Sequence, residues 1–300
     1  MTKTRHIFDL RGGGMGDAVC AAWIAQGAKA HGISVEFSSN KAPAASNILA
    51  HWPDRSEVLN LLGQTMTDEA GEPFHGAPGS GRLFDWELRY RGVRQPRPYL
   101  WQNRLGLNVH PERPPATIPV AAHDWALERC TRIAPDDQPL VLLFPTASFA
   151  IRSWPFQKWA RLAHALTEAG LAVACIDFSM EVVERLPNPI GCEPLAHIAA
   201  LMGFASLVVV NDSGPAHLSG TLETPTLALM GPTDPVTAFG YCPDIECMSA
   251  PESEVRCVGC HFEPERGFSW VCDQGCEALS MLGWERVYER ATEMTKELVA

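Results

Sequence analysis

Apolar and polar positions along this chain follow two alternating patterns, one typical of buried strands and one typical of amphipathic helices. Continuous apolar runs such as LVLLFP indicate strands of a parallel sheet that is covered on both faces. Segments such as PFQKWARLAHALTEAG space apolar residues three or four apart and end at a glycine, as helices do. Predicted strands occupy residues 6–10, 33–39, 140–145, 171–178, 207–212 and 225–231. Predicted helices occupy residues 17–32, 123–135, 155–170, 194–205, 213–222 and 283–300.

The order of these elements predicts an α/β chain with two doubly wound domains that face a cleft. Residues 63–119 interrupt the pattern, because they are rich in Pro, Gly and Arg, and they predict loops and short elements. A linker is expected at residues 134–139. The expected parts are an N-terminal domain at 1–135, a C-terminal domain at 136–283 with a cysteine-rich segment at 242–276, and a last helix at 284–300 that can pack back on the N-terminal domain.

Composition narrows the class of protein. The chain has 300 residues, 46% of them apolar, which is typical of a soluble globular protein with room for two cores. No run is long and apolar enough to span a bilayer, and the N-terminus lacks the apolar core of a signal peptide, so we expect a cytoplasmic protein. A net charge of −11 argues against nucleic acid as a partner.

The glycine-rich stretch RGGGMGDAVCAAW follows the first predicted strand. A dinucleotide fingerprint needs G-x-G-x-x-G, but the sixth position is Asp17 when counted from Gly12 and Val19 when counted from Gly14. The glycines therefore favour a sharp turn that lets a substrate approach the backbone. Asp17 then lies near a helix N-terminus, where it is either a general base facing the cleft or a carboxylate that stabilises the helix dipole.

A second motif, NDSGPAHLSGTLETPTLALMGPTDP, begins at the end of the strand at 207–212. Asp212 or Ser213 can cap the following helix, and the free amides near Ser213 and Gly214 would face an anion. His217, in the same turn, can donate to a phosphate oxygen or serve only for packing.

Together these motifs resemble glycosyltransferase family 9, which includes the ADP-heptose:lipopolysaccharide heptosyltransferases. The stretch FPTASFAIRSWPFQKWARLAHALTEAG also matches the strand, loop and helix pattern of that family. The resemblance implies a GT-B fold, in which two Rossmann-like domains enclose the active site. It also implies an ADP-sugar donor, most plausibly an ADP-heptose, and transfer with inversion.

The resemblance assigns roles to individual residues. Asp17 matches the catalytic aspartate, and Ser213, Gly214 and His217 match the segment that holds the donor diphosphate. Arg152 stands where a cation would neutralise phosphate, and Met230 and Gly231 lie where the nucleotide base would pack. Helix amides and a cation can stabilise the departing diphosphate, so we expect no catalytic divalent cation, and no D-x-D site is evident.

The chemical class of the acceptor is indicated only by an excess of positive charge in one segment. From Arg82 to Arg113 there are seven arginines and three acids in an otherwise acidic chain. Arg89, Arg91 and Arg94 are candidates to bind an anionic acceptor, such as a lipopolysaccharide core or another phosphorylated glycan, and Arg97 lies close to them. A solvated loop with local ion pairs is the alternative.

Six of the ten cysteines lie between Cys242 and Cys276. Cys257 and Cys260 form one close pair, Cys272 and Cys276 form another, and eleven residues separate the pairs. Such spacing suits a tetrahedral structural Zn or Fe site. The cluster resembles a four-cysteine finger found in autotransporter heptosyltransferases, which modify protein. Reduced buried thiols or two disulfides are the alternatives.

The leading hypothesis is therefore an inverting glycosyltransferase that moves a sugar from an ADP-sugar to a hydroxyl of an anionic glycan, a lipopolysaccharide core or a protein. The alternative is a non-catalytic nucleotide-sugar- or glycan-binding scaffold with a structural metal finger. A nicotinamide cofactor is not expected, because the fingerprint fails and no acid ends the second predicted strand to hold a ribose. An oligomer is compatible with the sequence.

Overall fold

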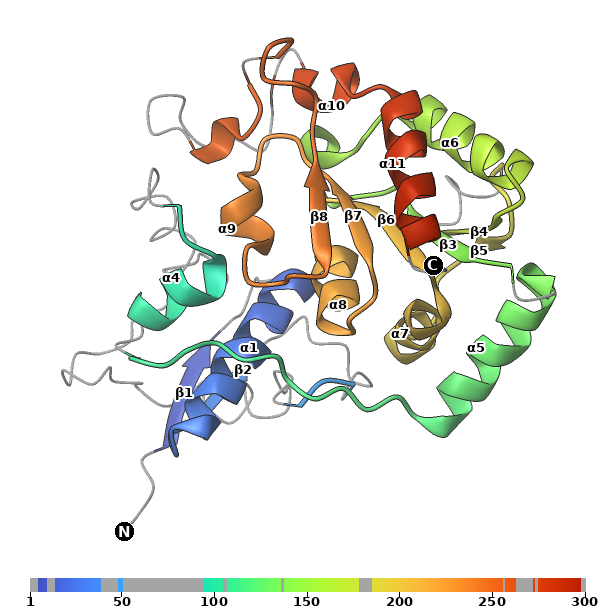
Figure 1. Ribbon diagram of the computed structural model, residues 1–300. Coiled ribbons are helices and arrows are strands. Elements are labelled where there is room, and N and C mark those ends of the chain that lie inside the picture. Colours follow the sequence, from blue (N-terminus) through green and yellow to red (C-terminus); the bar gives the residue numbers. More distant parts are fainter. Residues whose placement is uncertain are drawn as a thin grey trace.

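A six-stranded, wholly parallel sheet forms the centre of the C-terminal half of the computed structural model (Figure 1). The structure describes residues 5–9, 14–38, 48–50, 94–104, 107–135, 138–177, 185–255, 257–262, 272 and 275–297. The strands are β3 (Leu140–Phe144), β4 (Ala172–Ile176), β5 (Pro189–Ile190), β6 (Leu207–Asn211), β7 (Thr226–Leu229) and β8 (Ile245–Met248). Their order is β5-β4-β3-β6-β7-β8.

This strand order contains a switch point. The chain steps outward from β3 to β5, then returns to β6 on the other side of β3 and steps outward to β8. Ligands of open α/β sheets bind outside the carboxyl ends of the strands at such a reversal, here the ends of β3 and β6. The fold thus places the loop after Phe144 and the motif after Asn211 at one edge.

Helices cover both faces of the sheet, as the continuous apolar runs predict. Leu140 and Leu142 of β3 face one core, and Val141 and Leu143 face the other, because successive side chains alternate along a strand. The helices of this half are α5 (Val120–Ile133), α6 (Phe156–Glu168), α7 (Leu195–Phe204), α8 (Gly214–Thr221), α9 (Pro235–Phe239), α10 (Glu277–Met281) and α11 (Trp284–Glu297). Short 3-10 helices occupy Ala150–Arg152 and Cys260–Phe262.

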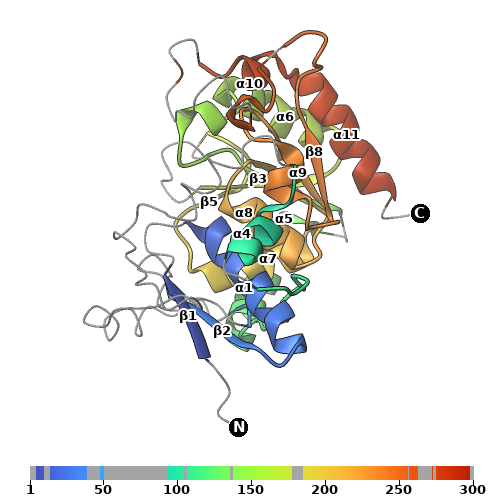
Figure 2. The same cartoon turned by 90° about the vertical axis from the view of Figure 1, so that its left-hand side faces the viewer.

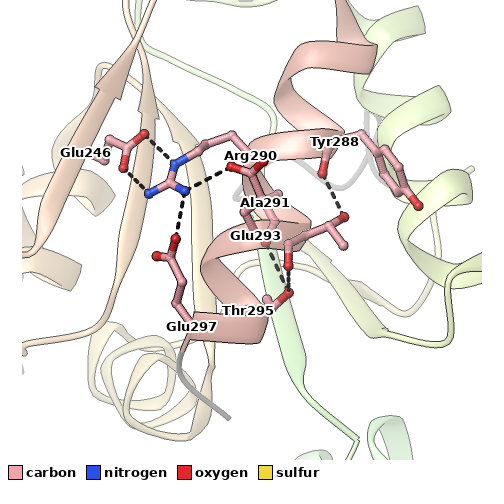
Figure 3. A network of polar contacts seen from close by, with 8 residues as sticks. Glu246, Tyr288, Arg290, Ala291, Glu293, Thr295 and Glu297 are labelled. Carbon is pink, nitrogen blue, oxygen red and sulfur yellow. Dashed lines mark hydrogen bonds and ion pairs between the residues drawn. The ribbon is translucent and has the colours of Figure 1, made fainter. Parts of the chain in front are cut away.

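The last helix, α11, lies against α6 and β6 of the C-terminal half (Figures 1 and 2). Arg290 on this helix binds both carboxylate oxygens of Glu246 on β8 at 2.8 Å, and it also pairs with Glu293 and Glu297 (Figure 3). The sequence allowed α11 to pack back on the N-terminal domain, whereas these contacts place it on the C-terminal sheet.

The N-terminal half contains the predicted strand, helix and strand unit. Its described elements are β1 (Arg5–Asp9), α1 (Met15–Ala30), β2 (Ser34–Ser38) and α4 (Arg97–Arg104). β1 and β2 pair in parallel. Among the described residues, no helix has the length and apolarity needed to cross a membrane.

Helix α1 joins the two halves, because it packs directly on α8 (Figure 1). Its apolar side chains share one core with α5, α7, α8 and one face of the six-stranded sheet. Trp23 Nε1 donates to Thr221 Oγ1 of α8 at 2.9 Å, and Arg113 pairs with Glu223 and Asp244 across the same boundary. The middle of α1 is thereby held beside the end of α8.

Candidate functional site

Asn211 fixes the switch point from the end of β6. The Trp154 backbone N–H donates to Asn211 Oδ1 at 2.9 Å, and Asn211 Nδ2 donates to the Phe144 carbonyl at 3.4 Å. Asn211 is wholly buried, so these contacts satisfy an amide that water cannot reach. The loop that carries Arg152 is therefore tied to the strand end from which the Asp-Ser-Gly motif begins.

The N-terminus of α8 follows directly. Ser213 is its N-cap, but its hydroxyl donates back to the Asn211 carbonyl at 3.1 Å and does not accept from the first turn. Pro215 occupies the first turn, where its missing N–H costs nothing. A Cβ atom on Gly214 would lie 2.7 Å from Met15 Cβ, so glycine at this position lets α1 approach α8 closely.

Arg152 and the buried Asp212 form an ion pair at this edge, with Arg152 Nη1 3.5 Å from Asp212 Oδ2. Burial by itself would raise the pKa of Asp212, but the charge of Arg152, a hydrogen bond from Thr233 and weaker effects of His217 and Arg97 outweigh it. The net pKa of Asp212 is lowered, so the carboxylate is ionised. Arg152, the residue predicted to neutralise phosphate, thus lies beside Asp212 at the carboxyl edge of the sheet and balances its charge.

Asp17 lies in the first turn of α1 and is 8% exposed. Its Oδ2 atom accepts from the Gly14 backbone N–H at 2.6 Å, which satisfies the amide of the N-cap residue at the start of the helix. Its Oδ1 atom lies 3.6 Å from Arg97 Nη1 of α4. One oxygen therefore has the helix-stabilising role, while the other faces a cation from a different element.

His217 lies in the contact between α1 and α8. A Cβ atom on Gly16 would come within 2.5 Å of its ring, and the ring also packs on Phe239, 4.6 Å between centroids. His217 Nδ1 is hydrogen-bonded to the Tyr241 hydroxyl at 2.6 Å. Burial, with the positive charge of Arg97, lowers the pKa of His217 to about 3, so the imidazole is neutral at pH 7. A neutral ring keeps one N–H for donation.

Met230 and Gly231 directly follow β7. Met230 is buried, and its N–H donates to the Met248 carbonyl at 2.7 Å. A Cβ atom on Gly231 would lie 2.9 Å from Cys276 Sγ, and the Gly231 carbonyl accepts from the Gly259 N–H. The turn after β7 is therefore packed against the cysteine-rich segment.

Of the three candidate acceptor arginines, Arg94 is described. Its Nε atom lies 3.2 Å from Asp234 Oδ2, the N-cap of α9, although the Arg94 side chain is 66% exposed. Arg89 and Arg91 lie outside the described residues. The arginine segment therefore contacts the donor-side half at this point.

The cysteine-rich segment is described in part. Burial is the main cause that raises the pKa of Cys276 to about 11, and Cys257 and Cys260 add to the shift, so these three residues lie near one another. Cys272 is exposed. Within the described portion of the segment, no group of three His, Cys, Asp or Glu side chains is arranged to hold a metal.

Sequence reasoning grouped Arg97 with the candidate acceptor arginines and did not place it beside Asp17, and it gave no role to Tyr241. Arg97 belongs to the arginine-rich stretch, and this excess of charge was the signal that could have found it. Tyr241 follows Gly240 directly after α9, in a stretch with no recognisable motif, and only the fold brings it to His217.

Comparisons with known proteins agree with this geometry. The family model described as Glycosyltransferase family 9 (heptosyltransferase) matches residues 99–264. Lipooligosaccharide heptosyltransferase 2 of Haemophilus influenzae is 31% identical over 114 residues, which cover 33% of this chain and 33% of that protein. The chain thus matches about a third of the length of that relative.

Two solved structures share the fold. The family 9 glycosyl transferase of Veillonella parvula superposes with a TM-score of 0.69 at 15% identity, covering 98% of this chain and 97% of the other. TibC of enterotoxigenic Escherichia coli, called an iron-containing dodecameric glycosyltransferase, superposes with a TM-score of 0.67 at 16% identity, covering 99% and 78%. TibC is also known in complex with ADP-D-beta-D-heptose. The predicted GT-B fold is confirmed.

Proposed function

Because the chain belongs to glycosyltransferase family 9, we propose that it transfers a sugar, a heptose, from an ADP-activated donor to an acceptor hydroxyl. One observation carries this proposal: two carboxylates, Asp17 and Asp212, and two cations, Arg97 and Arg152, gather where α1 meets the switch point of the sheet. Both motifs of the resemblance therefore contribute to a single charged centre.

The donor diphosphate would bind at the start of α8. The amides near Ser213 and Gly214 and the positive end of the helix favour an anion, and Arg152 lies beside them. Negative charge grows on the departing ADP oxygens in the transition state, so donors fixed in advance lower the barrier. Met230 and Gly231 would support the nucleotide base, and His217 would offer one N–H. No divalent cation or nicotinamide is assigned to the reaction.

Asp17 would act as the general base. The acceptor hydroxyl loses its proton to the Asp17 carboxylate while its oxygen attacks the anomeric carbon, and the bond from that carbon to the diphosphate oxygen breaks with release of ADP. Attack from the face opposite the leaving group inverts the anomeric centre. A positioned carboxylate base typically contributes about 10²- to 10⁴-fold to the rate.

The release of ADP from ADP-heptose tests this assignment, with and without an acceptor panel. We expect Asp17→Asn to lower turnover by about 10²- to 10⁴-fold while ADP still binds. Asp124→Asn, which changes an exposed acid on α5, is the matched control. Turnover by Asp17→Asn equal to that of wild type would overturn the role of Asp17. Tight binding of ADP-heptose by the wild type without turnover on any acceptor would instead support the scaffold alternative.

We propose an anionic glycan, a lipopolysaccharide core or a protein as the acceptor, with Arg89, Arg91 and Arg94 as its binding residues. Arg94 supports this role because it is exposed while it stays anchored to Asp234. We also propose a cytoplasmic location, since the ten cysteines are free thiols, as in proteins of a reducing compartment. The dodecameric state of TibC makes an oligomer a reasonable expectation.

A structural Zn or Fe ion at Cys257, Cys260, Cys272 and Cys276 remains part of the proposal. Two close pairs of free thiols are the kind of ligands that structural Zn and Fe sites use, and TibC is called iron-containing. The segment donates from the Gly259 and His261 amides to the Gly231 and Pro232 carbonyls. The ion would thus hold the turn after β7.

A further inference from the structure

We propose that Arg97 is a positioning residue for the transfer reaction, and that its guanidinium holds the Asp17 carboxylate in the orientation in which it receives the acceptor proton. This inference rests on the proposed role of Asp17 as the base. It assigns to Arg97 a task on the protein's own carboxylate, in place of the acceptor binding that the surrounding arginines suggested.

The backbone around Arg97 is rigidly placed. Arg97 is the first residue of α4, and the Tyr99 and Leu100 amides donate to the Pro96 carbonyl at 3.0 and 3.2 Å. Leu100 and Trp101 are buried in the core that α1 shares with the sheet. Helix α4 lies against both α1 and α9, so Arg97 starts from an anchored position at the boundary of the two halves (Figure 1).

The contact with Asp17 is largely withdrawn from water. The Arg97 side chain is 16% exposed and the Asp17 side chain 11%, with 3.6 Å between Nη1 and Oδ1. An ion pair with so little access to solvent is screened less than a surface pair. Since the Gly14 N–H holds the other oxygen, both carboxylate oxygens have a partner, and loss of Arg97 would leave only the hydrogen bond from Gly14.

The charge of Arg97 also reaches the donor side. It lowers the pKa of Asp212, in the loop after β6, and it contributes to the low pKa of His217 in α8. With His217 neutral, Asp17 and Asp212 are balanced by Arg97 and Arg152, so each carboxylate has one neighbouring cation.

The test is a double-mutant cycle between Arg97→Ala and Asp17→Asn, measured as kcat and donor KM. We expect Arg97→Ala alone to lower kcat about 10- to 100-fold, in the range that a displaced catalytic group produces, with donor KM changed less than threefold. Because Arg97 acts through Asp17, Arg97→Ala should lower activity less than twofold when Asp17 is already Asn. Arg97→Lys, or guanidinium chloride added at a concentration that does not denature, should restore part of kcat.

Arg290→Ala is the control, since it removes an arginine ion-pair network on α11 without touching the site (Figure 3). It should lower thermal stability and leave kcat within twofold of wild type. The positioning role of Arg97 would be overturned if the losses of kcat in the two single variants added in full in the double variant. It would also be overturned if neither Arg97→Lys nor added guanidinium restored any kcat. A fully active Asp17→Asn variant would instead refute the proposed function, so the two failures are distinguishable.

Discussion

The contact between Gly16 and His217 gives the sharpest prediction about stability. A methyl group on residue 16 would lie 2.5 Å from His217 Cδ2 and 2.9 Å from Nε2. Both distances are well inside van der Waals contact. The ring cannot yield easily, because Tyr241 holds it by a 2.6 Å hydrogen bond and Phe239 packs against it. Gly16→Ala must therefore displace α1, α8 or the His217 ring.

The expected cost follows from these constraints. Overpacking a well-filled core typically costs about 1–3 kcal/mol, and a broken His217–Tyr241 hydrogen bond adds about 1 kcal/mol. Alanine in place of glycine in a helix returns up to about 1 kcal/mol. The net loss in the free energy of unfolding is about 1–3 kcal/mol, or roughly 2–5 °C in Tm for a chain of this size.

Thermal and guanidinium unfolding followed by circular dichroism measure this loss. Gly203→Ala is the matched control, because it makes the same substitution in helix α7, where nothing lies within 4 Å of the new methyl group. The control should be as stable as wild type or slightly more stable. A further variant tests the cause: in a His217→Ala background the ring is gone, so Gly16→Ala should then cost almost nothing.

Two results would refute the reasoning. If Gly16→Ala matched Gly203→Ala in stability, the close approach of α1 to α8 would not exist in solution. If Gly16→Ala cost as much in the His217→Ala background as in wild type, the obstruction would come from atoms other than the imidazole ring.

Three further predictions follow from the site. Between pH 6.5 and about 3 the unfolded chain binds a proton at His217 that the folded chain does not bind. The free energy of unfolding therefore falls as pH falls through this window, by at most about 1.4 kcal/mol per pH unit. His217→Asn should flatten the slope of Tm against pH, and an unchanged slope would contradict the low pKa of His217. Asn211→Ala leaves the Trp154 N–H without its acceptor, so stability should fall by about 1–3 kcal/mol and ADP should bind more weakly by calorimetry; unaltered ADP binding would show that the Arg152 loop does not depend on Asn211. Elemental analysis should find about one Zn or Fe per chain, lost in Cys257→Ser, and a metal-free wild type of full stability would refute the finger.

The sequence predicted the central strands well and the edge strands poorly. β3, β4, β6 and β7 are buried along their whole length, so each is a continuous apolar run. β8 is half-buried at all four positions and includes Glu246, and β5 has only two residues, so neither forms such a run. Position at the edge of a sheet depends on strand order, which local patterns do not carry.

The site shows the same division. Asp17, Arg152 and the motif at Ser213 stand in local patterns that the sequence displays, and the fold brings them to one region. The contacts of Asp17 with Arg97 and of His217 with Tyr241 join segments that are distant in sequence. Periodicity cannot supply such pairs, since they depend on how α4 and the turn after α9 pack against α1 and α8.

The direct seating of α1 on α8 limits how pieces of related enzymes can be combined. Gly16 fits against His217, Gly214 fits against Met15, and Trp23 reaches Thr221, so each partner comes from a different half of the chain. A chimera that took its acceptor-side half from one enzyme and its donor-side half from another would have to transplant these pairs together. Without these pairs, α1 and α8 of a hybrid enzyme would not pack together, whichever donor and acceptor it was built to use.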